Sequence, residues 1–152
     1  IRPFTQSMAL IQSLTAAGEA VMSTVLSSSD SVQRIRSLLV EGVKAALPCV
    51  IFPFESAQQL SPYIVMMIVP GVPGEVLMRT LNDQGIVVST RSACSSKQSE
   101  PIPIFTLLGI ERSLHACSLR VSFSRDTTDE EVGVFLAALR SSVEELQWFY
   151  SN

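Results

Sequence analysis

The residue best suited to covalent chemistry in this sequence is Cys94, within the polar run Ser89-Thr-Arg-Ser-Ala-Cys94-Ser-Ser-Lys97. An apolar stretch, Gly85–Val88, comes directly before this run, so we expect the thiol on a loop at the end of a strand. Reactive cysteines are accessible and have thiolate character, and the nearby cations Arg91 and Lys97 favour the thiolate. The loop composition alone leaves open the alternative of an incidental surface cysteine.

Arg120 is the second candidate, because a guanidinium interrupts the otherwise apolar strand Ser118-Leu-Arg-Val-Ser-Phe. Its planar fork suits bidentate binding of a substrate carboxylate, and the alternative is a place on the solvent face of an edge strand. His115 and Cys117 are a weak metal signal, since one histidine and one cysteine do not make a ligand set. We therefore predict no metal site, ordinary packing or surface positions for these two residues, and a core position for Cys49.

The elements that must position these residues are a mixture of helices and strands. Apolar residues recur at three- or four-residue spacing over 7–26 and again over 32–47, which predicts two amphipathic helices separated by a turn at Ser27–Ser31. The other expected elements are strands at Cys49–Phe54, Tyr63–Val69, Ile86–Ser89 and Ser118–Ser124, a short helix at Glu75–Gln84 and a long helix opened by the capping box Thr128-Asp-Glu-Glu131. Together they predict an α/β fold with a small three- to four-stranded sheet packed by helices.

The composition limits the class of protein. A chain of 152 residues is expected to be one domain, here residues 1–152, with 47% hydrophobic and 16% charged residues. The mean hydropathy is +0.34, yet no run approaches the roughly 18 apolar residues of a membrane span. A net charge of −3 with scattered Lys and Arg does not indicate nucleic-acid binding. Three cysteines without a CxxC pair suit an intracellular reducing compartment, mitochondrial or cytoplasmic.

Several motifs resemble the carboxyl-terminal part of the cysteine desulfurases, which are pyridoxal-phosphate enzymes of the class V aminotransferase type. The motifs follow in the family's order: the serine-rich run around Cys94, Leu108-Gly109, Leu119-Arg-Val-Ser122, and Arg125-Asp-Thr-Thr-Asp-Glu-Glu-Val132. Weaker matches at Pro73-Gly-Glu75-x-Leu77 and Ile1-Arg2-Pro-Phe-Thr5 extend the resemblance over nearly the whole chain. The sequence departs from the family at Arg91, where a glycine is usual, and at Pro3-Phe4.

The resemblance implies that residues 1–152 form the small carboxyl-terminal domain of a fold-type I enzyme, with the large domain absent from this chain. It assigns to Cys94 the thiolate that attacks the sulfur of a cofactor-bound cysteine, leaving alanine and an enzyme persulfide. It assigns substrate-carboxylate binding to Arg120, and to Thr5 a contact with the cofactor phosphate of the neighbouring subunit. The Schiff-base lysine of pyridoxal phosphate has no counterpart here, so the chain alone is expected to be inactive.

The same resemblance implies a full-length homodimer that acts on L-cysteine and passes sulfur to an acceptor or scaffold protein. The sulfur would serve iron–sulfur cluster assembly or thiolation, with neither nucleic acid nor a membrane as partner. Three alternatives stay open: a selenocysteine lyase, a catalytically degenerate relative, and a stand-alone sulfur-carrier or interaction domain. The chain begins at Ile1 rather than at a methionine, and we expect it to be part of a longer protein.

Overall fold

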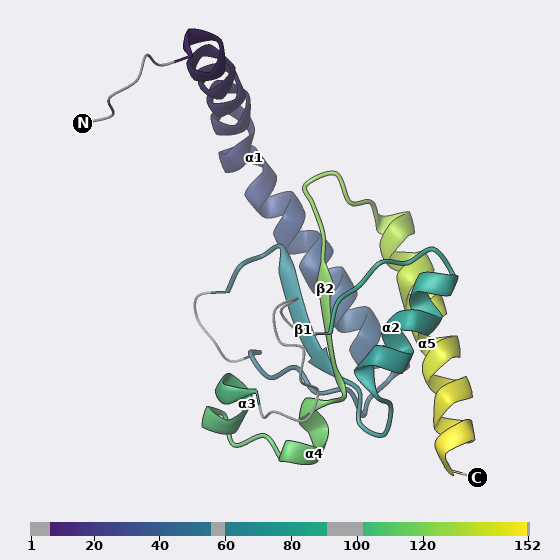
Figure 1. Ribbon diagram of the computed structural model, residues 1–152. Helices are drawn as coiled ribbons and strands as arrows, with labels where there is room; N and C mark the ends of the chain where they lie inside the picture. Colours follow the sequence, from purple (N-terminus) through teal and green to yellow (C-terminus); the bar gives the residue numbers. More distant parts are fainter. Residues whose placement is uncertain (1–6, 56–59, 91–101, 152) are drawn as a thin grey trace.

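One long helix runs through the molecule and carries the other elements on one half of its length (Figure 1). The computed structural model describes residues 7–55, 60–90 and 102–151. Helix α1 spans Met8–Ala46, and its first half projects away from the body while its second half lies behind the strands (Figure 1). The helix ends where proline would require it, because Leu47 leaves the helical region directly before Pro48.

The predicted turn at Ser27–Ser31 is wrong, since α1 continues through it as a single helix of 39 residues. The serine-rich stretch holds N-capping residue types but neither glycine nor proline. Serine and aspartate in a helix interior cost about 0.5 kcal/mol each relative to alanine, which is too little to end a helix that has already formed on both sides. The N-capping residue types at Ser27–Ser31 therefore do not mark the start of a second helix.

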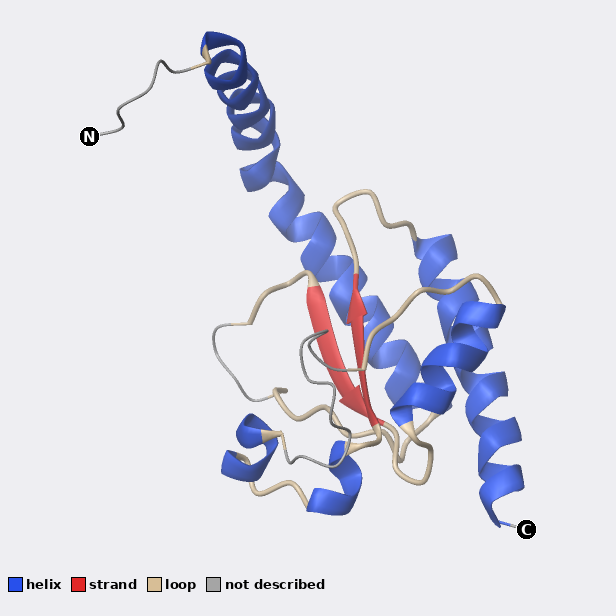
Figure 2. Ribbon diagram, viewed as in Figure 1, coloured by secondary structure: helices blue, strands red, loops and turns tan. Residues whose placement is uncertain are grey.

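The sheet consists of two antiparallel strands, β1 (Ile64–Ile68) and β2 (Ser118–Ser122), shown in red in Figure 2. Each strand has one isolated bridge on its outer side, Ile51 with Ile68 and Ser89 with Arg120. The described part of the chain thus has two strands instead of the expected three or four, and the strands predicted at 49–54 and 86–89 are reduced to single bridges. Pro53 explains the first case, because it has no N–H to continue the pairing.

The two faces of this sheet are different. Alternate residues of both strands point to one face, where Val65, Met67, Leu119 and Val121 are buried against the helices. The core on this side takes further apolar residues from α1, α2 and α5: Ile35, Leu39, Val43, Leu77, Leu81, Phe135, Leu139 and Val143. The opposite face carries Arg120. This face is buried at Ile68 and opens toward Ile64, which is 44% exposed.

Helices α2 (Gly74–Asp83) and α5 (Asp129–Ser151) lie side by side next to the sheet, and the short helices α3 (Pro103–Leu107) and α4 (Arg112–His115) lie below it in the view of Figure 1. The predicted capping box is confirmed: Thr128 N–H donates to the Glu131 carboxylate, and Glu131 N–H donates to the Thr128 hydroxyl. The predicted end of α2 is also confirmed, with Gly85 at φ +80. Among the described residues, no helix has the length and apolar character that crossing a bilayer requires.

Candidate active site

Arg120 lies at the centre of β2, on the face that the helices do not cover. Its side chain is half-buried, and its Nε is buried without a hydrogen-bond partner among the described residues. A buried N–H donor that lacks an acceptor costs roughly 1–3 kcal/mol, and an oxygen that reaches it removes this cost. β2 is paired on both sides at this residue, with Met66 on β1 and with Ser89. Arg120 is therefore not on an edge strand, and its Nε has room in its hydrogen bonding for an acceptor that the described residues do not supply.

The pairing with Ser89 connects Arg120 to the segment that carries Cys94. Ser89 N–H donates to the Arg120 carbonyl at 3.1 Å, and Arg120 N–H donates to the Ser89 carbonyl at 2.6 Å. Cys94 itself lies outside the described residues, as does Thr5. Cys94 follows Ser89 by five residues, and a chain of that length reaches about 18 Å at most. The residues before Cys94 predict a strand, but nothing in their sequence indicates that Ser89 pairs with Arg120.

His115 is buried, and both of its ring nitrogens bind backbone groups. Ile102 N–H donates to Nδ1 at 2.9 Å, and the ring packs edge-on against Phe105 with 5.4 Å between centroids. Because Nδ1 is an acceptor, the proton of the neutral ring is on Nε2, which donates to the Ile110 carbonyl at 3.0 Å. This is the packing role predicted for His115, and the described residues contain no cluster of three or more metal-ligating side chains.

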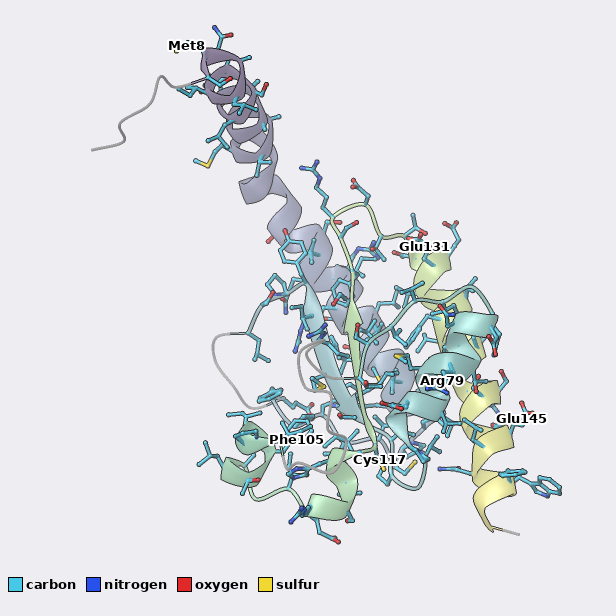
Figure 3. All side chains as sticks on the ribbon, viewed as in Figure 1. Met8, Arg79, Phe105, Cys117, Glu131 and Glu145 are labelled. Carbon is cyan, nitrogen blue, oxygen red and sulfur yellow. The ribbon has the colours of Figure 1, made fainter. Side chains whose placement is uncertain are left out.

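The two cysteines that the structure describes have opposite surroundings (Figure 3 labels Cys117). Cys49 is exposed, so its predicted core position is wrong: the next residue, Val50, is the one that turns inward. Cys117 is partly buried at the base of β2, and burial raises the pKa of its thiol, although backbone N–H groups of Gly71 and Val72 partly counter the shift.

A second arginine, Arg36 on α1, also has a buried Nε without a partner in the part of the chain that the structure describes. It lines a hollow of about 460 Å³ beside β1, together with Phe52, Phe54 and Met66. Ile51, the residue before Phe52, bridges the outer edge of β1, so the hollow lies on the β1 side of the sheet. Ser89 bridges the outer edge of β2, on the opposite side. Arg36 therefore provides a matched comparison for Arg120.

The described residues do not fit pyridoxal phosphate. The cofactor attaches through a lysine amine and needs donors for its phosphate. Lys44, the lysine that the structure describes, is paired with Glu55 and lies over the Phe52 ring on the outside of α1. Its ammonium group is thus occupied by this ion pair. A cofactor that acts at Arg120 would have to be held by residues other than those that the structure describes.

Comparison with known proteins gives one family. The pattern of the aminotransferase class-V family matches residues 5–135. The chain is 30% identical over 146 residues to the cysteine desulfurase IscS of Methanosarcina thermophila, covering 96% of this chain and 36% of that protein. It is 27% identical over 138 residues to a NifS/IcsS protein homolog of Lactobacillus delbrueckii subsp. bulgaricus, covering 91% of this chain and 36% of that protein.

A solved structure of a NifS-like protein has the same fold over 95% of this chain and 36% of its own, with a TM-score of 0.75 and 22% sequence identity. This chain belongs to the aminotransferase class-V family. The relatives described above bear the names of its cysteine desulfurase and NifS-like members, and the chain spans about a third of their length. The α/β class and the family resemblance expected from the sequence are confirmed.

Proposed function

We propose that the full-length protein is a cysteine desulfurase, in which this chain supplies the nucleophile, Cys94, and the substrate-carboxylate ligand, Arg120. One observation carries the proposal: the backbone of Arg120 is hydrogen-bonded to Ser89, five residues before Cys94. A half-buried guanidinium with an unpaired Nε therefore stands at the base of the segment with the thiol. The names of the relatives support the same reaction.

The chemistry of this chain's residues is a sulfur transfer. The Cys94 thiolate attacks the sulfur atom of L-cysteine, a sulfur–sulfur bond forms, and the carbon–sulfur bond of the substrate breaks. The electron pair of that bond stays with carbon, which takes up a proton and becomes the methyl group of alanine. Cysteine and a thiol thus give alanine and a persulfide, and no external oxidant is needed. Arg120 holds the substrate carboxylate so that the sulfur faces the thiolate.

Pyridoxal phosphate supplies the electron sink for such cleavage in this class of enzyme, and residues outside the chain would hold it. The chain by itself would then bind no cofactor and turn over no cysteine. The persulfide on Cys94 would pass to an acceptor protein, which fits a thiol on a polar, serine-rich segment.

Replacing Arg120 in the full-length enzyme tests the carboxylate role. We expect Arg120→Gln to lower kcat/KM for L-cysteine by about 100-fold, because two hydrogen bonds to a charged group are lost. Arg120→Lys keeps the charge but not the fork, and we expect an intermediate loss of about 10-fold. L-Cysteinamide, which has no carboxylate, is expected to be a poor substrate of the wild type and to be nearly unaffected by either substitution.

Arg36→Gln is the matched control, because it also removes a guanidinium with a buried, unpaired Nε but on the other edge of the sheet. It is expected to leave the preference for L-cysteine over L-cysteinamide unchanged. Equal losses for both substrates in Arg120→Gln would show that Arg120 supports the fold rather than the carboxylate, and the proposed role would be withdrawn.

A further inference from the structure

Pairing along the outer edge of β1 stops at Ile68, and a hollow lies beyond that point. Ile51 N–H donates to the Ile68 carbonyl at 2.9 Å, and Ile68 N–H donates to the Ile51 carbonyl at 2.8 Å. The same antiparallel register would bring Pro53 opposite Met66, and proline has no N–H to donate. Residues of both segments, 52–55 and 64–66, line the hollow of about 460 Å³.

The backbone of Met66 is directed toward this outer side of β1. In an antiparallel strand, the N–H and C=O groups of alternate residues point to the same side. Ile68 uses both groups for Ile51, so Met66, two residues earlier, also points its groups away from β2. Among the described residues, no hydrogen bond joins the Met66 N–H to a neighbouring segment. It is therefore a free donor at the wall of the hollow.

Arg36 supplies the positive charge of the hollow. It lies on α1 one turn before Val40, which lines the same hollow. The Arg36 side chain is half-buried, and it takes part in none of the ion pairs found in the described part of the chain. By contrast, Arg34 binds the Asp129 carboxylate with two nitrogens, at 2.8 and 2.6 Å. A half-buried cation without a counter-ion favours an anion beside it, because the loss of hydration strengthens Coulomb attraction.

The other walls of the hollow are mainly apolar. Phe52 and Phe54 lie on one side, and the Phe54 ring is in contact with Phe105, with 6.4 Å between centroids. The acidic residue of the lining, Glu55, is paired with Lys44, so its charge is balanced within the protein. Apolar walls with a few placed polar groups, around a volume of roughly 300–1,000 Å³, are typical of small-molecule sites.

We propose that this hollow binds a small carboxylic acid with an aromatic body. The Arg36 guanidinium and the Met66 N–H bind the carboxylate, and the aromatic body lies against Phe52 and Phe54. One cation and one N–H match the single charge and the two oxygens of a carboxylate. Arg120 is not among the residues that line the hollow, so the site is independent of the proposed function.

Titration of the full-length protein with phenylpropionate tests the site. We expect saturable binding by calorimetry with a Kd below about 1 mM. Phenylpropionamide, which lacks the charge, and acetate, which lacks the aromatic body, should each bind at least about 10-fold more weakly. In methyl NMR, phenylpropionate should shift the Met66 signal and leave that of Met67 unchanged, since Met67 faces the helix-covered core.

Arginine variants locate the carboxylate. We expect Arg36→Gln to raise the Kd of phenylpropionate by about 10- to 100-fold and to change that of the amide little. Arg34→Gln is the matched control, because Arg34 is on the same helix and is occupied by Asp129. It should leave the Kd within about 2-fold of the wild type, and Arg120→Gln should do the same.

A substitution at Ile64, which is 44% exposed, tests the site without removing Arg36. Ile64→Glu adds a carboxylate to the lining and should weaken binding at least about 10-fold relative to Ile64→Gln. The proposal would be overturned by three results: no saturable binding up to about 10 mM, equal losses in Arg36→Gln and Arg34→Gln, or a loss confined to Arg120→Gln. None of these measurements depends on whether the protein releases sulfur from cysteine.

Discussion

The two faces of the β1–β2 sheet are held by different interactions. On the helix-covered face, Met67 and Leu119 are fully buried in an apolar core. On the other face, Arg120 is half-buried. Hydrogen bonds connect the neighbouring segments to this part of the fold: Ser89 pairs with the Arg120 backbone, and the Ile102 N–H donates to the His115 ring. Apolar burial stabilises the first face in proportion to area, and directional contacts define positions on the second. The candidate site thus lies on the face opposite the helix-covered core.

The largest loss of stability should come from truncating a side chain that is buried on the helix-covered face. Leu119→Ala is expected to reduce the free energy of unfolding by about 3 kcal/mol, because it removes buried methyl groups and leaves a cavity. Ile64→Ala on the other face, where the side chain is 44% exposed, should cost less than about 1 kcal/mol. Urea unfolding of the full-length protein, with hydrogen exchange at the β1 and β2 amides, measures both. Similar losses would mean that the two faces are not divided in this way.

A pair of glycines tests the join between α2 and the start of β2. A Cβ on Gly74 would lie 2.3 Å from the Ser118 carbonyl oxygen, and backbone atoms cannot move aside easily. We expect Gly74→Ala to destabilise by about 2 kcal/mol and to raise hydrogen exchange at Ile102, since Ser118 is displaced next to His115.

Gly42→Ala is the matched control, because its Cβ would meet only the mobile end of the Leu136 side chain, at 2.4 Å. Its effect should be under about 1 kcal/mol, with Ile102 exchange unchanged. If Gly74→Ala left Ile102 exchange at the wild-type rate, the contacts around Ser118 would not be coupled to His115.

The smallest effect should come from the exposed ion pair between α1 and α5. Arg34 binds Asp129 with 2.6 Å between the closest nitrogen and oxygen, and this hydrogen bond lowers the pKa of Asp129 below its ordinary value of 3.8. The folded state therefore binds this proton less readily than the unfolded state. The contribution of the pair is present above pH 3.8 and is lost as the pH falls through the lowered pKa.

Arg34→Gln should accordingly lower the unfolding temperature only slightly at neutral pH and not at all at pH values where Asp129 is protonated in both variants. Thermal unfolding of the two proteins across the acid range measures the difference. A difference that grew as the pH fell would contradict the assigned direction of the pKa shift.

The sequence predicted the helix-covered face well, because its signals are local. The alternation predicted over Ser118–Ser124, the Thr128 capping box and the glycine that ends α2 each depend on a few neighbouring residues. The capping box and the glycine are confirmed, and the strand is present with its end two residues earlier, at Ser122. The turn at Ser27–Ser31 was wrong because capping residues permit a helix start without requiring one. The core position predicted for Cys49 was wrong because a residue next to a strand can face either the core or the solvent.

The candidate site was less accessible to sequence reasoning, because its contacts join distant residues. Nothing local to Ser89 indicates that it pairs with Arg120, and nothing local to His115 indicates that it accepts the Ile102 N–H. In Pro-Ile-Pro, residues 101–103, only Ile102 has a backbone N–H to donate, but nothing in the tripeptide indicates which residue accepts it. Cys94 and Arg120 were proposed from residue type and family motif, and their roles stay predictions.

The most direct test of the account is to locate the sulfur that the full-length enzyme removes from L-cysteine. The protein is incubated with L-cysteine, alkylated and digested, and mass spectrometry identifies the peptide that has gained a sulfur atom; Cys49→Ser and Cys117→Ser variants serve as controls. We predict a persulfide on Cys94 in the wild type and in both controls, and neither a persulfide nor sulfide release in Cys94→Ser. A persulfide on Cys117 or Cys49, or sulfide release at the normal rate by Cys94→Ser, would contradict the account.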